Sequence, residues 1–191
     1  GNYEVNPDIL IPRPETETLI EHIENSKLQP KRILDLGTGS GCIAIELSKI
    51  FPKATVDAID LNIKAISIAK KNAKNNNARV RFLISNWYQK VSLKYDLIVS
   101  NPPYVDKSAN FNDSLKFEPE EAIFSGENGL KDLRMIISQS KNYLNYGGII
   151  FLEHSPKQKK IITNLLKKSG FRDVTSIKDL KGIERFTFGK L

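Results

Sequence analysis

Short apolar segments alternate with longer amphipathic segments along this chain, and the alternation restricts the folds it can adopt. Short apolar runs are typical of buried strands, and apolar side chains at helical spacing are typical of helices. Because parallel strands need crossovers between them, this order predicts an α/β fold with a doubly wound, mostly parallel sheet. The predicted strands are RILDLG, TVDAIDL, VRFLIS and YDLIVS, and the predicted helices between them include CIAIELSKIF and IKAISIAKKNAK, with Ile63, Ile66, Ile68 and Ala69 facing inward.

The rest of the chain completes a seven-stranded sheet with one reversal of strand direction. The connection around LKGIE is too short for a crossover helix, so the last strand is predicted to be antiparallel. A long irregular stretch, Tyr104 to Gly129, favours a functional segment. The other predicted elements are a helix from Pro14, a helix over 130–144 that ends before Gly147 and Gly148, a strand over 148–154, a helix over 157–170, and strands over 173–179 and 185–191.

The length and composition favour one domain over residues 1–191. Residues 1–30 are predicted to form an extended segment and a helix, and residues 31–191 the core. No apolar run is long enough to span a bilayer. A single cysteine excludes an internal disulfide, which agrees with a cytoplasmic location, and two distant histidines indicate no metal site.

The formal net charge of +7 suits a polyanionic partner, such as RNA or a ribosome-associated protein. The alternative is that lysine is simply used heavily throughout the chain. The lysine-rich segment KKNAKNNNARVR is typical of a solvated helix end followed by a turn. The charge is therefore a hint about partners and does not locate a binding surface.

A glycine-rich turn follows the first predicted core strand, in ILDLGTGSGCIAIEL. Gly37, Gly39 and Gly41 have the spacing G-x-G-x-G, which is neither the dinucleotide-binding pattern nor a P-loop. Glycines permit close approach of a ligand to the backbone, and the following helix is expected to offer unpaired N–H groups. Alone, the pattern is equally typical of a tight strand-to-helix turn.

Two aspartates at strand tips indicate which ligand the turn would hold. Asp35 would repel a pyrophosphate but can bind the cationic head group of an amino acid. Asp60 ends the second core strand, where a carboxylate can accept hydrogen bonds from both ribose hydroxyls. A nucleoside that carries a cationic amino-acid tail is S-adenosylmethionine. After the third strand, Asn86 is predicted to hydrogen-bond the adenine and Trp87 to pack beside it, or else to cap the core.

The segment SNPPY follows the fourth strand and lies at the same predicted crevice. The Asn101 side-chain oxygen and the Pro102 carbonyl can accept the two N–H groups of a substrate –NH₂, and Tyr104 can cover a flat group. Planar amide or base nitrogens are weak nucleophiles, so orientation and preorganised acceptors are what such a site must supply. The alternative is a rigid loop exit. For Cys42 and His154, packing and a structural hydrogen bond are preferred over catalysis.

Six motifs in order resemble the peptide chain release factor glutamine methyltransferases of the HemK type. This resemblance implies a Rossmann-like class I fold and methylation of the side-chain amide nitrogen of the glutamine in a Gly-Gly-Gln loop. S-adenosylmethionine would be the methyl donor, leaving S-adenosylhomocysteine, and a release factor the protein partner. The motifs are ILIPRPETE, DLGTGSG, SNPPY, FEPEEAIFSGENGL, FLEHS and DLKGIERFTFG.

The resemblance also assigns roles to residues of this chain. Substrate contacts carry over to Asn101, Pro102, Pro103 and Tyr104, with Arg13 and Glu15 at the site entrance and Glu118 bracing the loop above it. A surface ion pair is the alternative for Arg13 with Glu15. Cofactor contacts carry over to Gly37, Thr38, Gly39, Ser40, Gly41, Asp60, Trp87 and Asn101.

Two departures from the family pattern are notable. Members normally carry a helical domain before IPRPETE, so this chain is expected to be either an artificially shortened form, with Gly1 left from cloning, or a naturally shortened member. Asn86 replaces a common aspartate, which predicts weaker adenine binding. Two other functions stay open: methylation of an exocyclic base nitrogen in RNA or DNA, and a non-catalytic cofactor-binding or partner-binding module.

Overall fold

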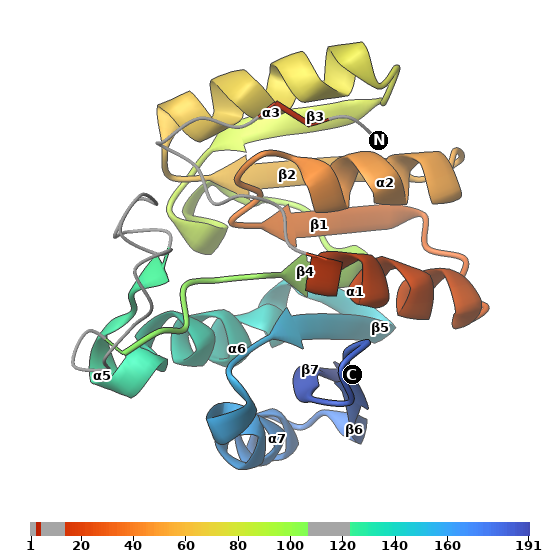
Figure 1. The fold of residues 1–191 in the computed structure, drawn as a ribbon. Coiled ribbons are helices and arrows are strands. Elements are labelled where there is room, and N and C mark those ends of the chain that lie inside the picture. Colours follow the sequence, from red (N-terminus) through yellow and green to blue (C-terminus); the bar gives the residue numbers. More distant parts are fainter. Residues whose placement is uncertain (1–2, 5–13, 107–122) are drawn as a thin grey trace.

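The computed structural model describes residues 3–4, 14–106 and 123–191. Seven strands form one sheet in the order β3-β2-β1-β4-β5-β7-β6 (Figure 1). Strands β1 to β5 are parallel, and β7 is antiparallel to both of its neighbours, which confirms the predicted sheet. The strands are β1 (Arg32–Leu36), β2 (Thr55–Asp60), β3 (Val80–Ile84), β4 (Tyr95–Ser100), β5 (Leu144–Glu153), β6 (Arg172–Lys178) and β7 (Glu184–Lys190).

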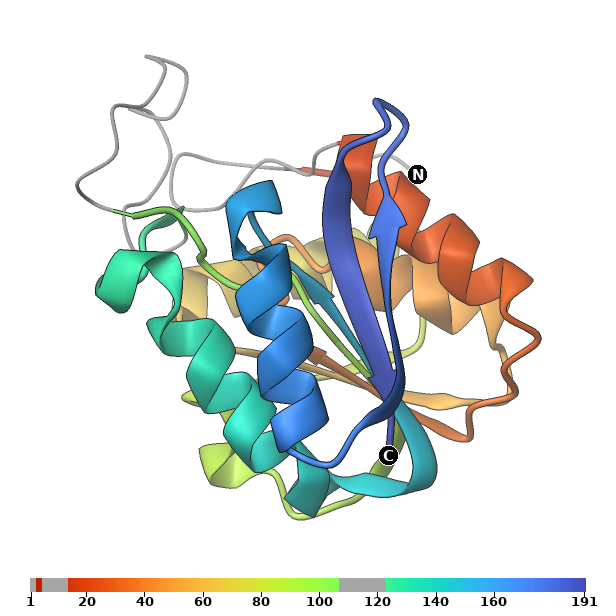
Figure 2. The same cartoon turned by 90° about the horizontal axis from the view of Figure 1, so that it is seen from below.

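Helices cover both faces of the sheet, as Figure 2 shows. In β1, Leu34 and Leu36 pack in the core covered by α6 and α7, whereas Ile33 packs in the core covered by α1 and α2. Because successive strand residues point to opposite faces, a strand buried on both faces reads as a continuous apolar run. The helices are α1 (Pro14–Asn25), α2 (Cys42–Ile50), α3 (Ile63–Asn75), α5 (Gly126–Gly129), α6 (Lys131–Tyr143) and α7 (Lys159–Lys168), with 3₁₀ turns η1 (Trp87–Lys90) and η3 (Pro156–Gln158). Among the described residues, no helix has the length and apolar character needed to cross a membrane.

The order of the strands determines where a ligand-binding crevice lies on the sheet. The connections go to opposite sides of β1, so the crevice at the carboxyl ends of β1 and β4 is the topological switch point. The Ser100 hydroxyl at the end of β4 donates to the Leu36 carbonyl at the end of β1, at 2.7 Å. This hydrogen bond fixes the two strand ends relative to each other.

Two sequence predictions about the elements are wrong in detail. The helix predicted over 130–144 ends at Tyr143, and the strand predicted from residue 148 already begins at Leu144. Leu144 is buried and pairs with Tyr95, and Gly147 takes a positive φ of 77° within the strand. Pairing with a distant strand therefore outweighed the local helical pattern. Ile63, expected to face inward, is the first residue of α3 and is 66% exposed.

Candidate active site

The loop between β1 and α2 is a tight turn whose backbone donors bond within the protein. The N–H groups of Gly37 and Thr38 both donate to the Ile59 carbonyl, at 2.8 and 2.9 Å. The N–H of Gly39 donates to Asp60 Oδ2 at 2.9 Å. The turn uses these three donors to join β1 to β2, whereas the expectation of unpaired N–H groups concerned the start of α2 at Cys42 and stays a prediction. A phosphate cradle needs such donors to be available, so this loop is better suited to another ligand.

Asp35 lies fully buried in β1, one residue before the strand ends. The Thr38 hydroxyl donates to its Oδ2 at 2.6 Å, and Oδ1 has no hydrogen-bond partner among the described residues. Burial raises the pKa of Asp35 to about 7, and the hydrogen bonds from the Thr38 hydroxyl and the Ala44 backbone only partly offset this. A buried carboxylate with a spare oxygen lacks the cation or donors that would stabilise its charge. The site therefore favours a cationic ligand group.

Asp60 lies at the end of β2 with both carboxylate oxygens already oriented. Oδ2 accepts the Gly39 N–H and Oδ1 accepts the Asn62 N–H, each at 2.9 Å. Burial raises the pKa of the Asp60 carboxyl as well, although the hydrogen bonds from the backbone act to lower it. The next residue, Leu61, is 65% exposed. A fixed carboxylate beside an exposed apolar side chain suits the hydroxyls and the flat base of a nucleoside.

Trp87 lies against the glycine turn and against the core. A Cβ atom added to Gly37 would lie 3.4 Å from the indole ring. The indole N–H donates to Asp132 Oδ1 at 3.2 Å, and Asp132 Oδ2 accepts the Ser125 hydroxyl at 2.7 Å. Trp87 also has a positive φ of 45°, which is uncommon for a bulky residue, and the exposed Asn86 precedes it. The indole ring thus packs against the core, one of the two places that the sequence proposed for it, and packing beside an adenine stays a prediction.

The residues Asn101–Tyr104, called the acceptor loop below, leave the end of β4 at the crevice. Asn101 and Pro103 are half-buried, and Pro102 is buried. The Tyr104 hydroxyl donates to Glu153 Oε1 at 3.0 Å, and Glu153, at the end of β5, is 1% exposed. The ring of Tyr104 is thereby held in place from a neighbouring strand.

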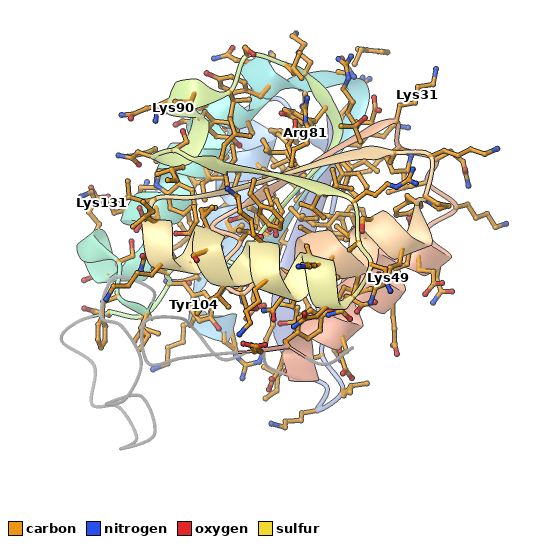
Figure 3. The ribbon with its side chains drawn as sticks, turned by 90° about the horizontal axis from the view of Figure 1, so that it is seen from above. Lys31, Lys49, Arg81, Lys90, Tyr104 and Lys131 are labelled. Atoms are coloured by element: carbon orange, nitrogen blue, oxygen red, sulfur yellow. The ribbon has the colours of Figure 1, made fainter. Side chains whose placement is uncertain are left out.

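The labelled cations show that positive charge is not confined to this end of the molecule. In Figure 3, Tyr104 lies at the same end as Lys90 and Lys131, while Lys31 and Lys49 lie toward the opposite end. The distribution of these four lysines does not single out the crevice as an anion-binding surface.

Of the residues predicted to line the entrance, Glu15 alone is described. It lies in the first turn of α1, and its carboxylate accepts a hydrogen bond from Lys181 Nζ at 3.3 Å. Lys181 belongs to the connection between β6 and β7. Arg13 and Glu118 lie outside the described residues. The entrance roles of Arg13 and Glu15 and the bracing role of Glu118 stay predictions.

The two residues predicted to be structural have structural partners. His154 is fully buried, with Nε2 at 2.7 Å from the Thr187 hydroxyl and Nδ1 at 2.9 Å from the Ser155 carbonyl. Burial lowers the pKa of His154, so the ring is neutral near pH 7. Cys42 packs against the core beside α1 and α2, and desolvation raises the pKa of its thiol to about 12. The structural contacts predicted for both side chains are therefore present.

Comparison with known proteins identifies the family. Residues 14–117 match the family model of the methyltransferase small domain. A release factor glutamine methyltransferase of Francisella tularensis is 44% identical over 195 residues, which cover 98% of this chain and 68% of that protein. This chain belongs to the release factor glutamine methyltransferases. Other relatives at 37 to 43% identity carry the same name.

Solved structures confirm the fold of this methyltransferase as that of class I S-adenosylmethionine-dependent enzymes. A methyltransferase from Pyrococcus furiosus has a TM-score of 0.73 at 21% identity, covering 98% of this chain and 87% of that one. A Thermus thermophilus 16S rRNA methyltransferase in complex with AdoMet and guanosine has a TM-score of 0.70 at 20% identity, covering 94% and 43%. At these identities the likeness concerns the fold alone.

Four side chains that support the site were not found from the sequence. Ser100 joins two strand ends, Glu153 holds Tyr104, Asp132 holds Trp87, and Gln158 donates to the Tyr104 carbonyl at 2.9 Å. Each acts on a partner far away in the sequence, which no local pattern reports. The one available signal was the S-x-x-Q spacing that ends in Gln158, typical of a helix capping box.

Proposed function

We propose that this methyltransferase transfers a methyl group from S-adenosylmethionine to the side-chain amide nitrogen of the glutamine in the Gly-Gly-Gln motif of a release factor. The observation that carries the proposal is the buried Asp35 carboxylate, with a spare oxygen, in the same crevice as the Asn101–Pro102 acceptors. The names of the relatives support the choice of a release factor over a nucleic acid.

The residues present fit S-adenosylmethionine. The spare oxygen of Asp35 would accept from the ammonium group, and Asp60 would accept from the ribose hydroxyls. Trp87 and Asn86 would contact the adenine, and the backbone of the turn, Gly37 to Gly41 with Thr38 and Ser40, would line the amino-acid tail. When bound, this cofactor supplies an electrophilic methyl group on a sulfonium.

The acceptor loop would orient the substrate nitrogen. The Asn101 side-chain oxygen and the Pro102 carbonyl would accept the two N–H groups of the glutamine amide, so that the nitrogen faces the methyl group. Pro103 and the ring of Tyr104 would enclose the flat amide. Because the amide is a weak nucleophile, these fixed acceptors stabilise the positive charge that develops on nitrogen during transfer.

The experiment is a mass measurement on a release factor incubated with this chain and S-adenosylmethionine. A gain of one methyl group on the Gly-Gly-Gln peptide, and none on a release factor in which that glutamine is replaced by alanine, would support the proposal. RNA is offered in the same reaction. Label on RNA alone would favour the base-methylating alternative, and calorimetry without cofactor binding would favour a non-catalytic module.

The place of the reaction and its surroundings belong to the same proposal. We infer a cytoplasmic location, since the relatives' names place their substrates in translation. Proximity to a ribosome or RNA stays a prediction from the net charge of +7. Salt-dependent co-sedimentation of the protein with ribosomes would test it.

A further inference from the structure

The far end of the acceptor loop is held by a side chain from the exit of another strand. Gln158 is the last residue of η3, which follows β5, and is 6% exposed. Its Nε2 atom lies 2.9 Å from the Tyr104 carbonyl, 3.1 Å from that of Gly129 and 3.3 Å from that of Asn128. Figure 2 shows the start of α7, the short α5 and the chain after β4 at one end of the sheet.

A helix-capping role explains the oxygen of the Gln158 side chain but not its nitrogen. Its Oε1 accepts the Ser155 N–H at 3.0 Å and completes a capping box at the start of η3. A glutamate would accept that N–H equally well. Only an amide can also donate, and the two hydrogens on Nε2 face three carbonyl oxygens. The Nε2 group of Gln158 therefore binds Tyr104 and the 128–129 turn and takes no part in capping the helix start.

The packing around this contact leaves no room for a larger side chain. Gly129 has a positive φ of 79°, and a Cβ atom added there would lie 2.2 Å from the Tyr104 carbonyl oxygen and 2.7 Å from Gln158 Nε2. Three segments of the chain thus meet at one carbonyl group. Beyond it, the Val105 N–H donates to the Ile123 carbonyl at 3.0 Å, which continues the contact between the two segments.

The acceptor loop is short and stiff between its two ends. At its start, Ser100 is bonded to the Leu36 carbonyl at 2.7 Å. Pro102 and Pro103 have fixed φ angles, so the path of the loop depends on where its ends are held. The end at Tyr104 is held by Gln158 through the main chain and by Glu153 through the hydroxyl.

We propose that Gln158 is a positioning residue for methyl transfer. By holding the Tyr104 carbonyl, it fixes the acceptor loop so that the Asn101 oxygen and the Pro102 carbonyl stay aligned for the substrate amide. In this role Gln158 acts through the Tyr104 main chain and not by contact with substrate or cofactor. This inference rests on the proposed function and adds the residue that sets the geometry of its acceptors.

The test variant is Gln158→Glu, which keeps the size and the capping acceptor and removes both donors. The matched control is Ser155→Ala, which removes the other half of the capping box and leaves the three carbonyl contacts. For Gln158→Glu we expect kcat on a release factor to fall on the order of 10²-fold, as for a misplacement of about 1 Å. The dissociation constant for S-adenosylmethionine should stay within about twofold, and Ser155→Ala should keep near-normal kcat.

Hydrogen exchange gives a readout that needs no substrate. The Val105 amide should exchange faster in Gln158→Glu than in the wild type, whereas the amides of β1 should not change. Should Gln158→Glu fail to fold, Gln158→Met removes the donors without adding a charge, and the same changes are expected. Normal kcat in the folded donor-less variant, or an equal loss in Ser155→Ala, would overturn the proposal. A wild-type chain that methylates no release factor would refute the proposed function, whereas unchanged exchange at Val105 would refute the positioning role alone.

Discussion

Replacing Asp35 by asparagine should stabilise the protein and weaken the binding of its cofactor. The Asp35 pKa of about 7 lies roughly three units above its ordinary value of 3.8, because the folded chain buries the carboxylate. At about 1.4 kcal/mol per unit, keeping the charge in the folded state costs on the order of 4 kcal/mol above pH 7. Asparagine keeps a bond to the Thr38 hydroxyl and removes this cost.

The sign of the pH dependence follows from the direction of the pKa shift. Between pH 4 and pH 7 the unfolded chain ionises Asp35 while the folded chain keeps its proton, so this group lowers stability as the pH rises. The stability gain of Asp35→Asn over the wild type should therefore be larger at pH 8 than at pH 5, by about 3 kcal/mol. Above pH 7 the gain should level off.

The measurement is urea unfolding of both proteins at pH 5 and pH 8 without cofactor. Asp96→Asn is the control. Partial burial raises the pKa of Asp96, but hydrogen bonds from Asn145 and from the backbone outweigh burial and lower it. Asp96 is then ionised at both pH values, so its substitution should give the same change at each. A stability difference for Asp35→Asn that does not vary with pH would refute the reasoning.

Three further variants distinguish residues that act on turnover, on cofactor binding and on stability. Asn101→Ala should lower turnover on the order of 10²-fold with cofactor affinity largely kept, since it removes an acceptor for the transition state; single-turnover kinetics and calorimetry check this. Asp60→Ala should instead weaken cofactor binding roughly tenfold or more by leaving ribose hydroxyls unpaired, measured by calorimetry. Tyr95→Phe should cost about 2 kcal/mol of stability in urea unfolding and leave kcat unchanged, because it removes a 2.7 Å hydrogen bond to Asp57 far from the crevice.

The sequence was sufficient for the sheet and for the residues at its strand ends. Alternating elements determine a parallel sheet, and parallel strands bring their carboxyl ends to one edge, so Asp60 and Asn101 were predictable as neighbours of the glycine turn. The start of β5 at Leu144 could not be predicted from the sequence, because it depends on pairing with the distant residue Tyr95. Gln158 was missed for a similar reason, since its partners Tyr104 and Gly129 lie 54 and 29 positions away.

Two buried aspartates in neighbouring strands, Asp57 and Asp35, differ in how fully their carboxylates are hydrogen-bonded. Asp57, 2% exposed, accepts two hydrogen bonds from Arg81, at 2.5 and 2.7 Å, and one from the Tyr95 hydroxyl. Asp35, at 0% exposure, has the Thr38 hydroxyl and the Ala44 backbone as donors, and no cation bonded to it among the described residues. Burial alone therefore does not explain Asp35, because the same fold supplies full partners to a buried acid elsewhere. This contrast supports our proposal that the ammonium group of the cofactor binds Asp35, which would recover the stability that the folded chain gives up there.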